Sequence, residues 1–377
     1  MRFSAPDAKA PLVVALSGGV DSSVAAWLLE REGRDLVGLF MRNGIKLDPA
    51  EVVKKSCCSL GDARDARMVA ASMGFPFQAV DLAEEFGSII DYFVSEYGRG
   101  RTPNPCAVCN RDLKMGRLMD FADEFGAAGV ATGHYAQIEV RDGRVKLRRG
   151  VDQHKDQSYQ LFSVSEEHLS RTVLPLGAYQ KSEVRALATE AGLRTSAKKD
   201  SQEVCFIPSN NYRELLAQRG TVLHPGKIVD VYGKVLADHP GTEHFTIGQR
   251  RGLGVATGKP IFVVELLPEE GLVVVGGHEH GLAQSMHVEN LNWIGYDAPD
   301  SFECTVQHRY HCHPEPCVVE CSGDAAQVYL KDDVLAVTPG QGAAFYIDDQ
   351  LVGGGWIARV KRSIDLPDES LEARLGG

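Results

Sequence analysis

The chain has 377 residues, a formal net charge of −11, 44% hydrophobic and 24% charged residues, which is typical of a folded protein with two or three domains. No apolar run approaches the roughly 20 residues of a membrane span, and the N-terminus lacks a signal-peptide hydrophobic region, so we expect a cytoplasmic protein with no membrane partner. Nine cysteines without a secretion signal argue against a disulfide framework and favour thiol chemistry or metal binding.

The stretch from Leu12 to Ser23 predicts a buried strand, a tight glycine turn and the start of a helix. Glycines at 18 and 19 let the backbone approach a ligand closely, and Asp21 and Ser22 are candidate caps of the helix. Free N–H groups at such a helix start bind phosphate or pyrophosphate, although an ordinary strand-turn-helix has the same spacing. No lysine follows the glycines as it does in a Walker A loop. Residues 254–260 fail that pattern too, because Pro260 stands where Ser or Thr is needed.

Strands and helices alternate over the next hundred residues. Strands are predicted at 35–41 and 77–80, and helices at about 62–71 and 83–97. This alternation predicts a doubly wound parallel sheet that binds its ligand at the carboxyl ends of the strands. Met41 ends the second strand and is a candidate for the adenine pocket or, equally, a core methionine. Cys57 and Cys58 are interpreted as structural or incidental.

A cysteine motif follows in residues 101–110, RTPNPCAVCN. If the segment is helical, Cys106 and Cys109 lie on one face, and a helix N-terminus with Arg111 and Lys114 would favour the thiolate. A zinc site needs four ligands and finds no second CxxC at the usual spacing. A redox dithiol would need a thioredoxin-like context. A nucleophilic cysteine beside a nucleotide site fits best.

Polar residues and basic clusters mark the next segment. A strand ends in ATGHY, residues 131–135, and a hairpin at 137–149 is predicted to turn at Asp142-Gly143. Residues 155–160 include an aromatic side chain able to stack on a base, and a helix is predicted at about 181–191. The cations near the cysteine motif and in the hairpin form two clusters that are either solvated surface or phosphate contacts. Cys205 is either buried and inert or made reactive by the lysines before it.

From about residue 213, short strands separated by Gly, Pro and Asp predict β domains. Strand-like runs at 325–330, 334–337 and 343–347 indicate a small C-terminal barrel. Cysteines and histidines between 304 and 321 match no standard zinc spacing, and alternation along strands explains them more simply.

Six motifs together resemble the tRNA-specific 2-thiouridylases, the MnmA family of PP-loop ATP pyrophosphatases. They are SGGVDS (17–22), TPNPCAVCN (102–110), ATGHY (131–135), KDQSY (155–159), DSQEVCF (200–206) and FTIGQRRGLG (245–254). Arg309, Tyr310 and residues 338–341 extend the match over nearly the whole chain. The resemblance implies an α/β PP-loop domain (adenine nucleotide alpha hydrolase-like) at 1–212, a central β-rich domain at 213–283 and a C-terminal β-barrel that contacts tRNA at 284–377.

The same resemblance implies a sulfurtransferase that uses ATP and Mg²⁺ to replace the C2 oxygen of uridine 34 by sulfur in tRNAs for Lys, Glu and Gln. Cys205 would carry a persulfide received from a cysteine desulfurase or sulfur-relay protein, and Cys109 would be the nucleophile that forms a disulfide with it. The implied ATP contacts are Ala15, Leu16, Ser17, Gly18, Gly19, Val20, Asp21, Ser22, Met41 and Gly133. The implied contacts to the target base or to the tRNA anticodon stem-loop are Asn104, Pro105, Cys106, His134, Lys155, Asp156, Gln157, Arg309, Tyr310 and Gln341.

Cys106 is a departure, because many members place aspartate there as an acid/base partner; cysteine is the other common variant. A thiol of pKa about 8.5 is no carboxylate at neutral pH, so another group or local positive charge must activate Cys109. Three alternatives remain for the function. Cys106, Cys109 and Cys205 could hold an iron–sulfur cluster, or the chain could be another PP-loop ligase or amidase acting on a small molecule. A non-catalytic tRNA-binding or sulfur-carrier protein is the third alternative.

Overall fold

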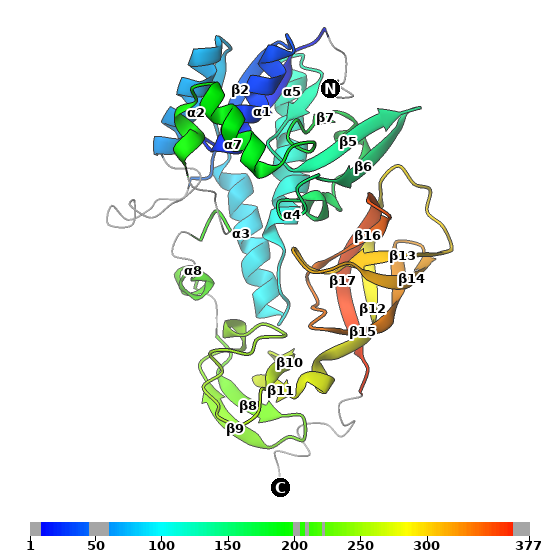
Figure 1. Ribbon diagram of the computed structural model, residues 1–377. Helices are drawn as coiled ribbons and strands as arrows, with labels where there is room; N and C mark the ends of the chain where they lie inside the picture. Colours follow the sequence, from blue (N-terminus) through cyan, green and yellow to red (C-terminus); the bar gives the residue numbers. More distant parts are fainter. Residues whose placement is uncertain (1–8, 45–59, 199–203, 208–210, 221–222, 365–377) are drawn as a thin grey trace.

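The computed structural model describes residues 9–44, 60–198, 204–207, 211–220 and 223–364. They form three parts: an α/β part at the top of Figure 1, a β-barrel at the right and a smaller β-sheet at the bottom. Cys57 and Cys58 lie outside the described residues, as do residues 200–203 of the motif around Cys205. Within the described ranges, no helix combines the length and the apolar character needed to cross a membrane.

The α/β part is built on a parallel sheet in the order β3-β2-β1-β4-β7. Its strands are β1 (Leu12–Ala15), β2 (Leu36–Arg42), β3 (Phe77–Asp81), β4 (Gly129–Ala131) and β7 (Thr172–Val173). Alternate residues of β1 face opposite cores. Val13 packs with α3 (Ala83–Gly98) and α5 (Leu118–Glu124) on one side, and Leu12 and Val14 pack with α1 (Val20–Arg31) and α2 (Leu60–Met73) on the other. The predicted doubly wound sheet is therefore confirmed. The strand order reverses between β1 and β4, where such sheets bind ligands.

Four helices of this part follow the predicted pattern, with one error at a cap, whereas the helices at 118–124 and 166–170 were not predicted. The helices of this part are α1 (Val20–Arg31), α2 (Leu60–Met73), α3 (Ala83–Gly98), α5 (Leu118–Glu124), α6 (Glu166–Ser170) and α7 (Lys181–Glu190), with short 3-10 turns η2 (Ser158–Leu161) and η3 (Arg194–Ala197). Asp21 and Ser22 do not cap α1. Gly19 is the N-cap and no side chain caps the helix, because both residues lie in its first turn with their side chains bound elsewhere.

The cysteine motif forms α4 (Pro105–Cys109), which continues as a π-helix, η1 (Asn110–Arg117), before α5. Asn104 caps α4, since its side chain accepts a hydrogen bond from the N–H of Ala107, and Pro105 suits the first helical position. Cys109 is the last residue of α4 and lies beyond the free N–H groups of the helix start. The predicted help of the helix N-terminus therefore does not extend to Cys109, and it stays a prediction for Cys106, which lies in the first turn of α4.

The predicted hairpin is present as β5 (Ala136–Arg141) and β6 (Arg144–Arg149), and Asp142 and Gly143 have the positive φ angles of 52° and 77° that its turn requires. Its place in the fold was not predicted. Leu147 and Arg148 of β6 pair with β17 of the barrel, so the hairpin extends the barrel sheet although it belongs to the first half of the chain.

The barrel consists of β12 (Leu282–Trp293), β13 (Ser301–Gln307), β14 (Glu315–Ser322), β15 (Ala325–Leu335), β16 (Gly342–Ile347) and β17 (Gln350–Arg362). Pairing of β12 with β17 closes it. The predicted strands at 325–330 and 334–337 form one strand as far as Leu335. The predicted barrel is confirmed.

The central part contains α8 (Tyr212–Gln218), which was not predicted, and a sheet in the order β10-β11-β8-β9. Its strands are β8 (Gly226–Asp230), β9 (Val235–His239), β10 (Phe262–Leu267) and β11 (Leu272–Gly276), with short turns η4 (Thr242–His244) and η5 (His278–Gly281). Helix α8 packs back on the α/β part, where Tyr212 stacks on Tyr97 with ring centroids 4.6 Å apart.

A buried histidine beside the barrel predicts acid sensitivity. His308 is 3% exposed, and burial, with a smaller effect of Arg309, lowers its pKa from 6.5 to about 4. The unfolded chain therefore binds a proton below pH 6.5 that the folded chain refuses, so stability falls as the pH drops through that range. From His308 alone we expect a loss of about 2 kcal/mol between pH 8 and pH 5.

Urea unfolding followed by tryptophan fluorescence at the two pH values measures this loss. His308→Gln should reduce it by about 2 kcal/mol, whereas His313→Gln, which alters an exposed histidine, should leave it unchanged. Equal losses in the His308→Gln variant and the unaltered chain would contradict the prediction.

Candidate functional site

The loop after β1 has a backbone that accepts only glycine at one position. Gly18 has φ +71°, and a Cβ there would lie 2.4 Å from the carbonyl oxygen of Asp62. The hydroxyl of Ser22 closes the loop by accepting from the N–H of Ser17 (3.1 Å), and its Oγ lies 3.1 Å from Oγ of Ser17. The loop thus joins the carboxyl end of β1 to the first turn of α1, the arrangement suited to pyrophosphate.

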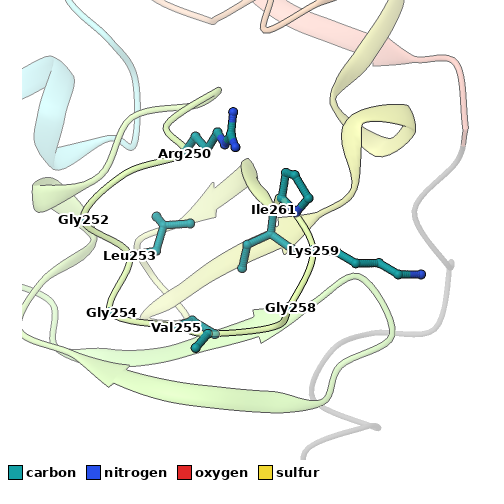
Figure 2. A pocket seen from close by; sticks show the side chains of 10 residues that line it. Arg250, Gly252, Leu253, Gly254, Val255, Gly258, Lys259 and Ile261 are labelled. Carbon is teal, nitrogen blue, oxygen red and sulfur yellow. The ribbon is translucent and has the colours of Figure 1, made fainter.

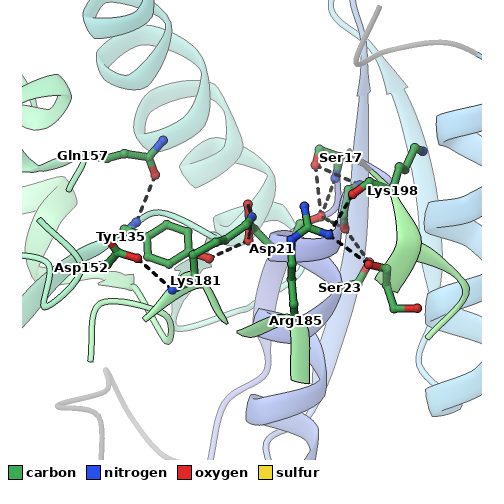
Figure 3. Close-up of polar contacts among 12 residues, drawn as sticks. Ser17, Asp21, Ser23, Tyr135, Asp152, Gln157, Lys181, Arg185 and Lys198 are labelled. Atoms are coloured by element: carbon green, nitrogen blue, oxygen red, sulfur yellow. Dashed lines mark hydrogen bonds and ion pairs between the residues drawn. The ribbon is translucent and has the colours of Figure 1, made fainter. Parts of the chain in front are cut away.

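Asp21, in that first turn, is held from two distant parts of the chain (Figure 3). The hydroxyl of Tyr135 donates to Oδ1 over 2.7 Å, and the ammonium group of Lys181 lies 2.6 and 2.7 Å from the two carboxylate oxygens. Gly133 lies against the same turn, because a Cβ there would come within 2.9 Å of the Ser22 nitrogen. The structure therefore brings together the loop and Gly133, as expected.

Lys198 is a second cation at this loop that the sequence analysis did not select. Its Nζ donates to the carbonyl of Gly18 (2.8 Å), to Asp62 (2.5 Å) and to Asp65 (2.9 Å). Burial lowers the pKa of Lys198, but the hydrogen bonds to the two carboxylates outweigh it and the net pKa is raised. Lys181 and Lys198 lie 160 and 180 residues from their partners in the loop, so no local pattern identifies either one.

The two predicted sulfur-handling cysteines belong to one apolar cluster. Cys109 is buried in the core between the sheet and α3, and Cys205 packs half-buried against that core. Ala15 and Met41, at the carboxyl ends of β1 and β2, pack against the same cluster. The guanidinium of Arg111 is bound to both oxygens of Asp112 (2.6 and 2.9 Å). Because Asp112 balances most of its positive charge, Arg111 favours the Cys109 thiolate less than the sequence predicted.

Asn104 and Gln341 are buried and hold the cysteine motif in place. Asn104 caps α4 and donates from Nδ2 to the hydroxyl of Tyr159 over 3.4 Å. Gln341, in the turn before β16, donates to the carbonyls of Thr102 (3.1 Å) and Pro103 (2.9 Å). The barrel therefore fixes the segment that leads into α4.

His134 is also buried, and its ring is neutral. Burial, and then the charge of Lys114, lowers its pKa well below 6.5. Its Nε2 lies 3.2 Å from Oδ1 of Asn110, whose Nδ2 donates to the carbonyl of Gln160 over 3.0 Å, and its Nδ1 lies 2.7 Å from Oγ1 of Thr132. The network assigns the proton to Nε2, so His134 positions Asn110 beside Cys109 and offers no positive charge to a phosphate.

Asp156 is buried within the loop after β6, and its carboxylate is fully occupied. It accepts from the guanidinium of Arg149 (3.0 Å), the N–H of Gly150 (2.9 Å), and the N–H and hydroxyl of Ser158 (3.1 and 2.9 Å). Its side chain therefore organises the loop and does not face outward.

Among the predicted base and tRNA contacts, the side chains with access to solvent are Cys106 and Arg309, which are exposed, and Lys155, Gln157 and Tyr310, which are half-buried. Pro105 is buried in the first turn of α4. Tyr310 stacks near Tyr159 with ring centroids 6.2 Å apart. Burial, followed by the charges of Asp156 and Cys106, raises the pKa of Tyr310 to about 12, so the barrel brings this ring close to Cys106.

Within the part of the chain that the structure describes, no three His, Cys, Asp or Glu side chains gather as a metal site. The iron–sulfur hypothesis for Cys106, Cys109 and Cys205 therefore gains no support. A cavity of about 600 Å³ lies elsewhere, in the loop between η4 and β10 (Figure 2), where Arg250 and Lys259 line a ring of glycine-rich backbone.

Comparison with known proteins matches all three parts of the chain. A family model described as "tRNA methyl transferase HUP domain" matches residues 10–209. Models described as "tRNA methyl transferase PRC-barrel domain" and "Aminomethyltransferase beta-barrel domain" match residues 213–277 and 283–357. The first model alone spans more than half of the chain.

Curated relatives match over nearly their whole length, and each is named "tRNA-specific 2-thiouridylase MnmA". The protein of Geobacter metallireducens is 47% identical over 93% of this chain and 97% of its own length. That of Rhodopirellula baltica is 42% identical over 92% and 96%, and that of Carboxydothermus hydrogenoformans is 44% identical over 92% and 97%. The chain therefore belongs to the MnmA family of tRNA-specific 2-thiouridylases.

Proposed function

We propose that this protein is an ATP-dependent tRNA sulfurtransferase that converts uridine 34 of tRNAs for Lys, Glu and Gln to 2-thiouridine. The observation that carries the proposal is the common apolar cluster, which joins Cys109 and Cys205 to Ala15 and Met41 at the strand ends beside the pyrophosphate loop. An activating site and two thiols packed against one core suit a reaction that first activates a carbonyl and then delivers sulfur to it. The names of the relatives support the 2-thiolation of tRNA in this proposal.

In the first step the C2 carbonyl oxygen of uridine attacks the α-phosphorus of ATP and pyrophosphate leaves. The oxygen, a poor leaving group by itself, then departs as part of AMP. The loop at 17–22 and the first turn of α1 would bind the leaving pyrophosphate. Gly18 and Gly133 leave room where a Cβ would collide with backbone. Mg²⁺, when bound with ATP, would neutralise phosphate charge.

In the second step the terminal sulfur of a persulfide on Cys205 attacks the adenylated C2. The thiolate of Cys109 then attacks the inner sulfur of Cys205, the persulfide S–S bond breaks and AMP leaves. The transferred sulfur gains the two electrons that the cysteines lose in forming a Cys109–Cys205 disulfide. Two equivalents of an external thiol restore the cysteines, and a desulfurase or sulfur-relay protein reloads Cys205.

The target base must leave the anticodon loop stack to reach these groups. Cys106, Arg309 and Tyr310 are accessible near the cysteine motif, and Lys155 and Gln157 lie on the adjacent loop. We assign direct RNA contact to these five side chains. The buried members of the predicted set, Asn104, Pro105, His134, Asp156 and Gln341, are assigned to holding them in place.

Mass spectrometry of tRNA nucleosides tests the proposal. The purified chain, an unmodified tRNA transcript, Mg-ATP and a persulfide donor should give 2-thiouridine together with equal amounts of AMP and pyrophosphate. Absence of 2-thiouridine with both cysteines intact would defeat the proposal. The description of the matching family model names methyl transfer. A methylated nucleoside formed from S-adenosylmethionine without ATP would favour that activity. Such a reaction has no use for a loop that binds pyrophosphate.

The glycine-rich loop of Figure 2 offers a second surface for RNA. Arg250, Arg251 and Lys259 are all exposed, and residues 248–261 contain no acidic side chain to balance them. Three unbalanced cations on one loop of a chain with net charge −11 are suited to the phosphate backbone of tRNA, because phosphate contacts depend on local charge density.

We expect substitution of Arg250, Arg251 and Lys259 by Gln to weaken tRNA binding and to lower the slope of log K against log salt by about 2 to 3. Filter binding between 50 and 200 mM salt measures the slope. Substitution of Arg31, Arg64 and Arg67 by Gln, on the exposed faces of α1 and α2, removes the same charge and serves as the control. An equal change in both variants would show that only net charge matters.

A further inference from the structure

Tyr135 connects the loop after β6, which we assign to tRNA binding, with the loop at residues 17–22, which we assign to ATP binding. Its main chain is bound twice to Gln157: its N–H donates to Oε1 of Gln157 (3.0 Å), and its carbonyl accepts from the N–H of Gln157 (2.8 Å). Its hydroxyl donates to Asp21 over 2.7 Å. The ring between these ends is 3% exposed, so the phenol is fixed by packing as well as by hydrogen bonds.

A second connection leads from the same loop after β6 to the carboxylate of Asp21. Asp152, buried at the start of the loop, accepts from the backbone N–H of Lys181 over 2.9 Å, and the Lys181 ammonium binds both oxygens of Asp21. Figure 3 shows Gln157, Tyr135, Asp21, Lys181 and Asp152 as one continuous chain of contacts. Tyr135 and Lys181 therefore hold Asp21 from two sides, and the loop after β6 positions both of them.

We propose that Tyr135 is a positioning residue that couples tRNA binding to ATP binding. The inference rests on the proposed function, since it needs both ligands. tRNA bound to Lys155 and Gln157 stabilises the hydrogen bonds that Gln157 already makes to the Tyr135 backbone. The phenol thereby holds Asp21 and the first turn of α1 more firmly in the arrangement that binds the triphosphate. Because linkage is reciprocal, bound ATP must strengthen tRNA binding by the same factor.

Paired affinities test the coupling. The probe is α,β-methylene-ATP with Mg²⁺, which cannot transfer its adenylyl group, and its Kd is measured with and without a saturating unmodified tRNA transcript. For the unaltered chain we expect tRNA to tighten analogue binding about ten-fold or more. In Tyr135→Phe, which keeps the ring and removes only the hydroxyl, we expect less than a two-fold effect, while each ligand alone binds within about three-fold of the unaltered affinity.

Tyr232→Phe, which removes the same hydroxyl from a tyrosine that is 70% exposed, should retain the full coupling. Asp152→Ala removes the acceptor of the Lys181 N–H and should reduce the coupling through the other arm, which keeps the test valid if Tyr135→Phe folds poorly. Full coupling in Tyr135→Phe, or no coupling in the unaltered chain, would overturn the inference. If the unaltered chain nevertheless forms 2-thiouridine, the proposed function survives that failure; if it forms none, the proposed function itself fails.

Discussion

Replacing Cys109 by serine is expected to lower the rate of 2-thiouridine formation by about 1,000-fold or more and to leave tRNA-dependent pyrophosphate release within a few-fold of its original rate. A serine hydroxyl is a far weaker nucleophile than a thiolate at neutral pH, whereas adenylation of the base uses the loop at 17–22. Cys205→Ser should have the same effect, since the persulfide then has no carrier. Quantitative nucleoside mass spectrometry and a pyrophosphate assay on the same samples separate the two steps.

The matched control is Cys321→Ser, on β14 of the barrel, which should leave both steps unchanged. If both Cys109→Ser and Cys205→Ser still form 2-thiouridine, the proposed transfer of sulfur from Cys205 with the help of Cys109 is contradicted. Adenylation of a small molecule that is indifferent to both substitutions would instead favour a PP-loop ligase, because such an enzyme has no need of paired cysteines.

Gly18→Ala should reduce pyrophosphate release by about 100-fold. Alanine is strained at φ +71°, and its Cβ would lie 2.4 Å from the Asp62 carbonyl oxygen and 2.8 Å from the Asp62 Cα. Because these are backbone atoms, no side chain can rotate away and the loop must shift. Strain of about 3 kcal/mol at the loop corresponds to about two powers of ten in rate.

Gly33→Ala separates the effect of the Cβ collision from the conformational strain of an alanine at a positive φ angle. Gly33 has φ +76°, and nothing lies within 4 Å of a Cβ built there, so this variant carries the conformational strain without the clash and lies outside the loop. It should keep nearly all of the activity. A Gly18→Ala protein that releases pyrophosphate at half the original rate would show that the loop is not closely fitted to its ligand.

The local elements were predictable because their signals are local. A continuous apolar, β-branched run followed by glycines predicted β1 and the loop after it, and Asp142-Gly143 predicted the turn of the hairpin correctly. The errors arose where a local pattern has two meanings. Asp21 and Ser22 are good capping residues by type. In the structure, however, the Asp21 side chain binds Tyr135 and Lys181, and the Ser22 side chain binds Ser17. Helix α8 was missed although Tyr212, Leu215 and Leu216 have the i, i+3, i+4 spacing of an apolar helix face, because seven residues are too short for a clear pattern.

The sequence by itself determined the class of chemistry. A glycine loop after a buried strand, two separated cysteines and six motifs in order were enough to select the fold class and the family. Only the tertiary structure decided what each residue does. It buried Asn104, His134, Asp156 and Gln341, which we therefore assign as supports. It also joined the hairpin to the barrel and placed Tyr135 and Lys181 on Asp21 across 114 and 160 residues. Periodicity records neighbours two to four positions apart, whereas these contacts depend on packing between segments that lie far apart in the chain.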